Sequence, residues 1–319
     1  MSDQNSNWER GVLEKLATSA LQEQRRARRW SIFFKSLTFA YLFFILFLLM
    51  GWIGHGESGL STGKHTAIID LDGVISQTSQ ASADNLIASL QAAFKDKGTQ
   101  GVILRINSPG GSPVQSGLVN DEIRRLRALH PDIPLYAVVE DMCASGGYYI
   151  AAAADKIYVN KASIVGSIGV LMDGFGFTGT LNKLGVERRL LTAGENKGFM
   201  DPFSPRNAKH EAFTKAMLAE IHQQFITVVR EGRGKRLKET PETFSGLFWS
   251  GQKSIEMGLA DELGSAEGVA RDVIKAENIV DFTSRDGFAD RLAKRFGAGV
   301  ASAFPGFSSQ LGNSGIVLR

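Results

Sequence analysis

An uncharged apolar run from Ser36 to Gly54 constrains this chain more than any other feature. As a helix, its 19 residues would span about 28 Å, close to the hydrocarbon core of a bilayer, which is about 30 Å thick. A cleaved signal peptide is disfavoured, because a long polar region precedes the run and no Ala-x-Ala site follows it. The run therefore predicts one transmembrane helix over residues 36–54, with the lipid bilayer as its partner.

Basic residues just before this run predict its orientation. They are Arg25, Arg26, Arg28, Arg29 and Lys35. The positive-inside rule then places the N-terminus in the cytoplasm and the bulk of the chain outside it. We expect a cytoplasmic segment over residues 1–35 with a short amphipathic helix within residues 1–29, and a Gly/Ser-rich flexible tether over residues 55–64.

Beyond the tether, strand-like and helix-like segments alternate. Predicted strands cover residues 66–71, 102–106, 134–139, 157–159, 168–172 and 186–191. Predicted helices cover residues 83–94, 115–129, 145–154, 207–230, 250–258 and 266–277. Such alternation indicates an α/β domain with a covered sheet, which we place at residues 65–295. The remaining tail, residues 296–319, lacks clear periodicity and is expected to be mobile.

Composition limits the classes of function. The net charge is +3, and the basic excess is concentrated ahead of the apolar run. No basic stripe interleaved with aromatic residues follows, so no nucleic-acid partner is expected. The single cysteine, Cys143, excludes an intrachain disulfide, and the five histidines lack metal-ligand spacing. We therefore expect neither a metal nor a cofactor.

The segment Met142–Tyr149 places Ser145 among small residues, between a predicted strand and a predicted helix. A hydroxyl at such a junction lies near the partial positive charge of a helix N-terminus, where backbone N–H groups can stabilise a developing oxyanion. Serine is also a common helix N-cap. From this segment alone, the nucleophile and N-cap interpretations stay equally open.

Two further segments bear on that choice. Asn107–Ser112 carries a strand into a Pro-Gly-Gly turn, whose glycines allow a backbone N–H to approach a reacting carbonyl closely, although an ordinary turn fits too. Lys197 has apolar neighbours in Phe199, Met200 and the Pro202-Phe203 pair. An isolated lysine is usually a solvated surface charge. A serine nucleophile nevertheless needs a base, and a lysine amine can serve when burial lowers its pKa.

Four motifs taken together resemble the signal peptide peptidase A family of serine peptidases, in its short single-copy form. In chain order they are Asn107-Ser-Pro-Gly-Gly, Ala144-Ser-Gly-Gly-Tyr, Gly166-Ser-Ile-Gly and Thr192-Ala-Gly-x-x-Lys197. The resemblance covers about residues 65–285. The first motif is shared with the Clp proteolytic subunit and its crotonase-like fold, whereas the Lys197 segment separates this family from that one.

The resemblance implies a crotonase/Clp-like superhelix of ββα units and a Ser–Lys dyad. In it, Ser145 is the nucleophile and Lys197 the general base, Gly111 and Gly146 supply the oxyanion hole, and Ser167 is a supporting hydroxyl. One departure is Asn196, where many relatives have an aromatic residue. That leaves the wall of the base pocket less defined by the motif.

The resemblance also implies a place and substrates. It describes a single-pass protein of the bacterial inner membrane with a periplasmic catalytic domain, which cleaves signal peptide remnants or other short unfolded apolar peptides. Several chains are expected to form a homo-oligomeric ring. Whether the serine and lysine of one site come from one chain or two stays open. The alternatives are a crotonase-like acyl-CoA enzyme, which would need neither Lys197 nor an anchor, and a non-catalytic membrane scaffold.

Other nucleophiles and bases are less favoured. Cys143 lies two residues before Ser145 and could act as a thiol nucleophile, but no histidine or asparagine motif accompanies it. A small buried residue near a strand end is the commoner role of a free cysteine. The histidines His55, His65, His130, His210 and His222 all lie outside the small-residue motifs. We therefore expect them to be solvated or locally bonded.

Overall fold

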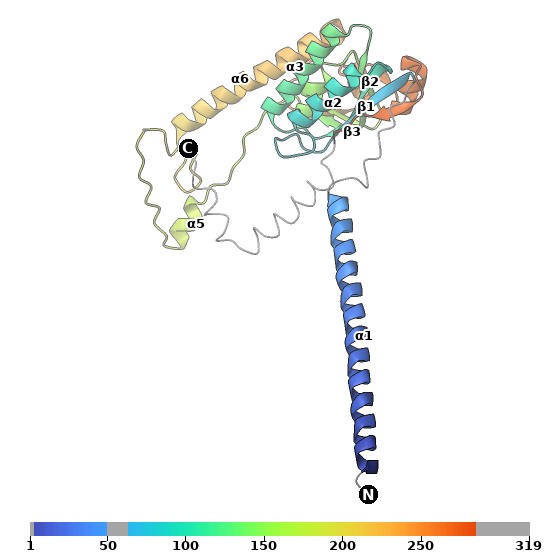
Figure 1. Ribbon diagram of the computed structural model, residues 1–319. Helices are drawn as coiled ribbons and strands as arrows, with labels where there is room; N and C mark the ends of the chain where they lie inside the picture. Colours follow the sequence, from blue (N-terminus) through green and yellow to red (C-terminus); the bar gives the residue numbers. More distant parts are fainter. Residues whose placement is uncertain (1–2, 50–62, 285–319) are drawn as a thin grey trace. The chain divides into compact units, whose positions relative to one another are not determined.

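The computed structural model describes residues 3–49 and 63–284 (Figure 1). The chain divides into two units, of which one contains residues 1–57 and 286–319 and the other residues 58–285. The helix α1 is the described part of the first unit. The second unit, called the body below, contains the sheet and all remaining helices.

Helix α1, Asp3–Leu49, is continuous over 47 residues. The predicted amphipathic helix within residues 1–29 and the described part of the predicted transmembrane segment are therefore one helix. Its segment Glu23–Phe47 contains an 18-residue window with a mean hydropathy of 1.7 and is long and apolar enough to cross a membrane. Residues 50–54 of the predicted span, most of the predicted tether and the predicted tail lie outside the described residues.

Three long parallel strands form the centre of the body. They alternate with two helices, in the order β1 His65–Asp72, α2 Ala83–Lys95, β2 Thr99–Ser108, α3 Pro113–Leu129 and β3 Leu135–Ala144. Each helix begins at a serine, Ser82 or Ser112, whose side chain accepts a hydrogen bond from the first turn. Both helices lie on the same face of the sheet (Figure 1).

Strand β3 forks, and this fork positions the candidate site. Its first half pairs at Tyr136–Val138 with β4, Lys156–Val159, and its last residues pair at Met142–Ala144 with β5, Ile164–Gly166. The edge strands are short: β6 Phe248–Ser250, β7 Glu262–Leu263 and β8 Ile279–Asp281. The main path through the sheet is β6-β5-β3-β2-β1-β8, with only β6 antiparallel to its neighbour. Ser145 therefore follows β3 at the branch of the sheet that leads to β5.

Both faces of the sheet are buried, as expected of a parallel sheet. One face packs Ile69, Leu104 and Val139 against α2, α3 and two further helices, α4 Gly146–Ala151 and α6 Ala208–Arg233. The other face packs Ile68, Ile103 and Val138 beneath the short helix α8, Ala266–Gly268, and a π-helix at Val269–Ile274. Two small elements complete the order: the 3-10 turn Gly234–Arg236 and α7, Gly251–Glu256.

The α/β prediction is confirmed, but two predicted strands are wrong. Residues 169–207, called the excursion below, leave the sheet and contain one short helix, α5 Thr178–Lys183. The segments predicted as strands, 168–172 and 186–191, form no strand in the structure. Both segments are apolar, which made them strand-like, yet neither has a strand to pair with in the body. Leu191 is 95% exposed as a result. The domain boundaries stay predictions.

A buried ion pair connects the last residue of α6, Arg233, to Asp261, the residue directly before β7. Arg233 is 1% exposed and donates two hydrogen bonds of 2.9 Å to Asp261 and one of 2.8 Å to the Gly258 carbonyl. Burial alone would raise the pKa of Asp261, but the hydrogen bonds and charge of Arg233 outweigh it and hold that pKa below its ordinary value. The pair is therefore stabilised in its charged form.

We predict that Arg233→Ala lowers the free energy of unfolding by about 3–5 kcal/mol, because it removes the buried guanidinium with its two hydrogen bonds and leaves Asp261 paired only with the more exposed Arg236, at 3.3 Å. The matched control is Arg271→Ala, which removes an exposed ion pair with Asp272 and should leave that free energy nearly unchanged. Urea denaturation of both variants measures the difference. Because the pKa of Asp261 is lowered on folding, the contribution is present at neutral pH and declines as the pH falls through the folded-state value. Equal effects of the two substitutions would contradict the prediction.

Candidate active site

Ser145 occupies a strained turn between β3 and α4. Its backbone has φ 50° and ψ −121°, a left-handed conformation that costs a residue with a side chain about 1–3 kcal/mol. Its N–H donates to the Gly166 carbonyl of β5 at 2.9 Å, and its carbonyl accepts from Tyr149 N–H at 2.9 Å. The side chain makes no capping hydrogen bond to α4. Ser145 therefore occupies the N-cap position of α4, but its half-buried hydroxyl does not cap the helix.

The Pro-Gly-Gly turn after β2 contacts this serine turn directly. Gly110 and Gly111 have φ of 97° and 151°. The Gly110 carbonyl accepts from Ile75 N–H at 2.9 Å, and the Ile75 carbonyl accepts from Ser112 N–H at 2.9 Å, so a short bridge holds the turn. A Cβ at Gly110 would lie 2.6 Å from the Gly146 nitrogen and 2.7 Å from the Ser145 Cβ. Only glycine allows the two turns to approach this closely.

Two backbone N–H groups meet beside Ser145. A Cβ on Gly146 would lie 3.2 Å from the Gly111 nitrogen and 2.5 Å from Ser116 Oγ, so the two glycine peptides are adjacent. Within the described residues, neither the Gly111 nor the Gly146 N–H donates a hydrogen bond to another residue. Adjacent N–H donors next to a serine are the arrangement that stabilises the oxyanion of an acyl-transfer reaction.

Ser167 lies at the neighbouring strand end. Ala144 pairs with Gly166 in the register of β3 and β5, so Ser145 and Ser167 leave adjacent strands at the same level. Gly166 and Ser167 both have positive φ, 117° and 51°. Ser167 N–H donates to the Leu247 carbonyl at 2.8 Å, which fixes the turn. The structure therefore brings four of the five predicted residues together: Ser145, Gly146, Gly111 and Ser167.

Lys197 lies elsewhere in the chain. It is exposed on the excursion, and its neighbour Phe199 packs on His210 and Phe213, in the first turns of α6, with ring centroids 4.7 and 5.7 Å apart. Helix α6 reaches the serine side of the body further along, at His222, whose Nε2 lies 3.1 Å from the Ile168 carbonyl, and at Phe225, whose ring lies 5.0 Å from that of Tyr149. Phe213 and Phe225 are separated by about 18 Å along a helix axis. The Lys197 segment thus lies beside the first turns of α6. Figure 1 shows that this end of α6 projects away from the sheet.

The apolar residues predicted to enclose Lys197 do not do so within one chain. Met200 is 48% and Phe203 is 39% exposed, and Phe203 stacks on Phe177 of the same excursion with centroids 5.5 Å apart. The excursion folds on itself and on the end of α6, so it leaves its own apolar side chains open to solvent. The expected dry environment for the lysine is therefore absent from the described part of a single chain.

The rival nucleophile is excluded by its surroundings. Cys143 is fully buried in β3, and burial raises the pKa of its thiol far above the neutral range. Burial therefore disfavours the thiolate, which is the reactive form. The motifs had not indicated Ile75 or Ser116, which support Gly111 and Gly146, nor His222, whose Nε2 lies 3.1 Å from the Ile168 carbonyl beside Ser167. These contacts arise from elements far apart in the sequence, and no local signal points to them.

Comparison with known proteins agrees with this geometry. A family model for peptidase family S49 matches residues 127–280. A protein from Enterococcus faecium, whose name is that of a signal peptide peptidase, is 30% identical over 235 residues, which cover 71% of this chain and 67% of that protein. The chain belongs to peptidase family S49. The family predicted from the four motifs is therefore confirmed.

Other relatives of this S49 chain are much longer. Protease 4 of Haemophilus influenzae is 29% identical over 219 residues, which cover 67% of this chain and 35% of that protein. A protein of Brucella melitensis named as a Na⁺/H⁺ antiporter is 50% identical over 175 residues, 55% of this chain and 24% of that protein. The S49 chain thus spans about a quarter of the length of the Brucella melitensis protein. The antiporter name belongs to that whole, longer protein.

We predict that Gly110→Ala displaces the Gly146 peptide and reduces the reaction of Ser145 with a fluorophosphonate about 100-fold, the scale of losing one oxyanion donor. The matched control is Gly117→Ala on α3, where a Cβ meets nothing within 4 Å. That variant should react like the wild type. Labelling rates, with circular dichroism to check folding, give the comparison. A folded Gly110→Ala protein that labels at the wild-type rate would show that the contact between the two turns is dispensable.

Proposed function

We propose that this chain is a membrane-anchored serine endopeptidase that uses Ser145 as nucleophile and Lys197 as general base. The observation that carries the proposal is the strained Ser145 turn beside the adjacent Gly111 and Gly146 N–H groups. Membership of peptidase family S49 supports the reaction class. Neither alternative, an acyl-CoA enzyme or a scaffold, requires a serine nucleophile that is activated by a base.

The proposed mechanism has two steps. The lysine amine takes the Ser145 proton as Oγ attacks the peptide carbonyl, and the N–H groups of Gly111 and Gly146 hold the oxyanion. The lysine ammonium then gives its proton to the leaving amine, which breaks the C–N bond and leaves an acyl-enzyme. Water, deprotonated by the same amine, releases the acyl group and restores the serine. The Ser167 hydroxyl orients the amine by a hydrogen bond.

We propose further that the lysine of each site comes from a neighbouring chain in a homo-oligomeric ring. The support is the position of Lys197 at the outer end of α6 and the exposed apolar surface of the excursion. That surface contains Leu171, Phe175, Leu184 and Leu191, and the exposed Phe213 of α6 adjoins it through Phe199. A second copy packed there would bury these side chains and lower the lysine pKa by desolvation. One chain would then supply Ser145 and the next would supply the base.

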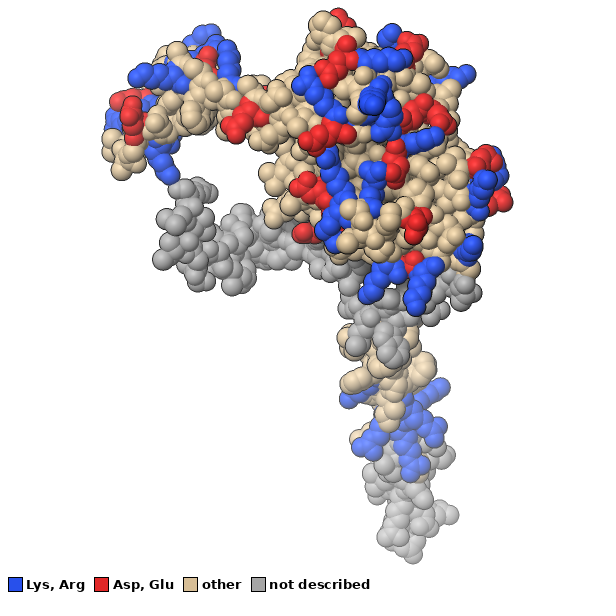
Figure 2. Space-filling model, turned by 90° about the horizontal axis from the view of Figure 1, so that it is seen from above, with Lys and Arg blue, Asp and Glu red and all other residues tan. Residues whose placement is uncertain are grey.

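The proposed substrates are cleaved signal peptides and other short unfolded apolar peptides. The name of the Enterococcus faecium relative and the candidate span in α1 support this choice, because an anchored enzyme works where such peptides are released. Acidic and basic side chains are intermixed on the face of the body shown in Figure 2, and a basic cluster lies on α1. That pattern favours peptides and lipid headgroups over nucleic acid. The proposed chemistry requires no cofactor and no metal.

We predict that Ser145→Ala and Lys197→Arg both abolish peptide hydrolysis while the melting temperature stays unchanged. The first removes the nucleophile, and the second keeps the positive charge but cannot accept a proton at neutral pH. The matched control is Lys183→Arg, in α5 of the same excursion. Turnover of an apolar fluorogenic peptide measures the loss. An active Ser145→Ala enzyme would remove the nucleophile assignment, and an active Lys197→Arg enzyme would remove only the base assignment. A wild-type protein that does not hydrolyse the peptide would favour the scaffold or acyl-CoA alternatives.

Mixing variants tests whether one site uses two chains. We predict that Ser145→Ala and Lys197→Ala chains, each inactive alone, regain about a quarter of the wild-type activity when mixed equally under conditions of subunit exchange. In a head-to-tail ring, that fraction of sites combines an intact serine with an intact lysine from the next chain. Fluorescence energy transfer between labelled chains establishes that exchange occurred. No recovery after proven exchange would place both residues of a site in one chain.

Protease accessibility tests the proposed topology. The arginine cluster ahead of the apolar span predicts a cytoplasmic N-terminus and a body on the outer side of the inner membrane. Protease added to intact spheroplasts should cleave a recognition sequence inserted at Gly174, in the excursion, where an added Cβ would meet nothing within 4 Å. The same sequence inserted near residue 5 should stay protected until lysis. The reverse pattern would invert the topology.

A further inference from the structure

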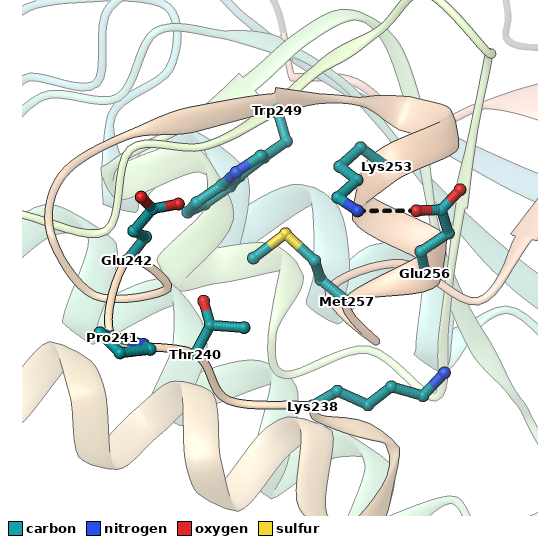
Figure 3. Close-up of a pocket in the computed structure, with 8 residues that line it drawn as sticks. All are labelled: Lys238, Thr240, Pro241, Glu242, Trp249, Lys253, Glu256 and Met257. Atoms are coloured by element: carbon teal, nitrogen blue, oxygen red, sulfur yellow. Dashed lines mark hydrogen bonds and ion pairs between the residues drawn. The ribbon is translucent and has the colours of Figure 1, made fainter.

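A cavity of about 560 Å³ lies beside the candidate active site, between the loop before β6, strand β6 and helix α7. Figure 3 shows its lining residues. They are Lys238, Thr240, Pro241, Glu242, Trp249, Lys253, Glu256 and Met257. Met257, which is 5% exposed, extends into the space between Trp249 and Thr240. The cavity is therefore large enough for an aliphatic or aromatic side chain.

The lining is apolar within and charged at the rim. Trp249, Pro241 and Met257 offer an indole, a pyrrolidine ring and a thioether, surfaces that accommodate side chains of varied shape. At the rim, Lys253 and Glu256 form an exposed ion pair of 2.8 Å, and the rim holds one further lysine and one further glutamate. Because the rim carries both signs equally, it does not select for the charge of a ligand. Burying a charge against the apolar interior would be unfavourable.

The wall of this cavity is also a support of the Ser145 turn. Val165 and Gly166 pair with Trp249 and Phe248, and a Cβ on Gly166 would lie 2.8 Å from the indole of Trp249. The Gly166 carbonyl in turn accepts the Ser145 N–H at 2.9 Å. The indole therefore packs on the residue that holds the nucleophile turn.

The distance to Ser145 suits an extended peptide. Strands β3, β5 and β6 are consecutive in the sheet, so the end of β3 lies about 10 Å from β6, or two strand spacings. An extended peptide covers that distance in about three residues.

We propose that this cavity is a subsite for an apolar side chain of an extended peptide, about three residues from the bond that is cleaved. The inference rests on the proposed peptidase function and deepens it, because it assigns a specificity pocket to Trp249, Met257 and Thr240. A side chain bound there presses the indole onto Gly166. Peptides with an apolar residue at this position therefore both bind and hold the Ser145 turn in place.

Filling the cavity tests the proposal in the full-length chain. Each position of an apolar fluorogenic peptide is changed in turn from Leu to Ala. In the wild type, the change from Leu to Ala at one position, about three residues from the cleaved bond, should lower kcat/KM about tenfold or more. Thr240→Phe, which narrows the cavity from its rim, should reduce that dependence to about twofold or less. Thr227→Phe, the same substitution on an exposed part of α6, should leave it unchanged. Equal position dependence in the Thr240→Phe and wild-type proteins would overturn the subsite.

A binding measurement separates this inference from the proposed function. The Leu-containing peptide is titrated into the Ser145→Ala protein, and tryptophan fluorescence is followed, with a Ser145→Ala, Trp249→Phe protein as the blank. The signal should change only when Trp249 is present, and Thr240→Phe should weaken the affinity about tenfold. An unchanged signal would reject the subsite even if fluorophosphonate labels Ser145. Binding without any labelling of wild-type Ser145 would reject the peptidase function and retain the peptide site.

Discussion

The hydrogen bond from Ser145 N–H to the Gly166 carbonyl, 2.9 Å long, is the interaction on which the arrangement of the candidate site depends. It joins β3 to β5 after β3 has forked away from β4, and it holds Ser145 at a positive φ that a serine does not adopt unaided. The strain is sustained because both strands are anchored in a buried sheet.

Glycine is required around this bond because three backbone segments converge there. The turn at Gly110 and Gly111 touches the peptide of Gly146, and the Gly111 turn is bridged to Ile75 from the loop after β1. A Cβ added at any of these three glycines would lie 3.2 Å or less from a backbone atom. The close approach places the Gly111 and Gly146 peptides next to each other beside Ser145, which is the physical basis of the proposed oxyanion site. The Trp249 indole supports the same turn from the opposite strand.

Lys197 shows how chain connectivity limits a single subunit. The excursion begins beyond Ile168 and returns through the long helix α6, so its tip lies at the outer end of that helix (Figure 1). A lysine base needs apolar surroundings, yet the apolar side chains of the excursion are exposed in one chain. Association with a second copy would bury the exposed apolar side chains and desolvate the lysine at the same time, because both belong to the excursion.

The sequence by itself determined the α/β class, the family and the order of the motifs, because periodic burial and glycine-rich turns are written locally in residues such as Val102–Ile106 and Gly110-Gly111. It also indicated the apolar helix that α1 contains. It misjudged residues 168–172 and 186–191, since an apolar run predicts a strand only where a partner strand exists. Only the tertiary structure decided that the Ser145 hydroxyl does not cap α4, that Ser167 lies at the level of Ser145 and that Lys197 lies at the other end of α6. Those outcomes depend on strand register and on the path of α6, which bring together residues far apart in the sequence.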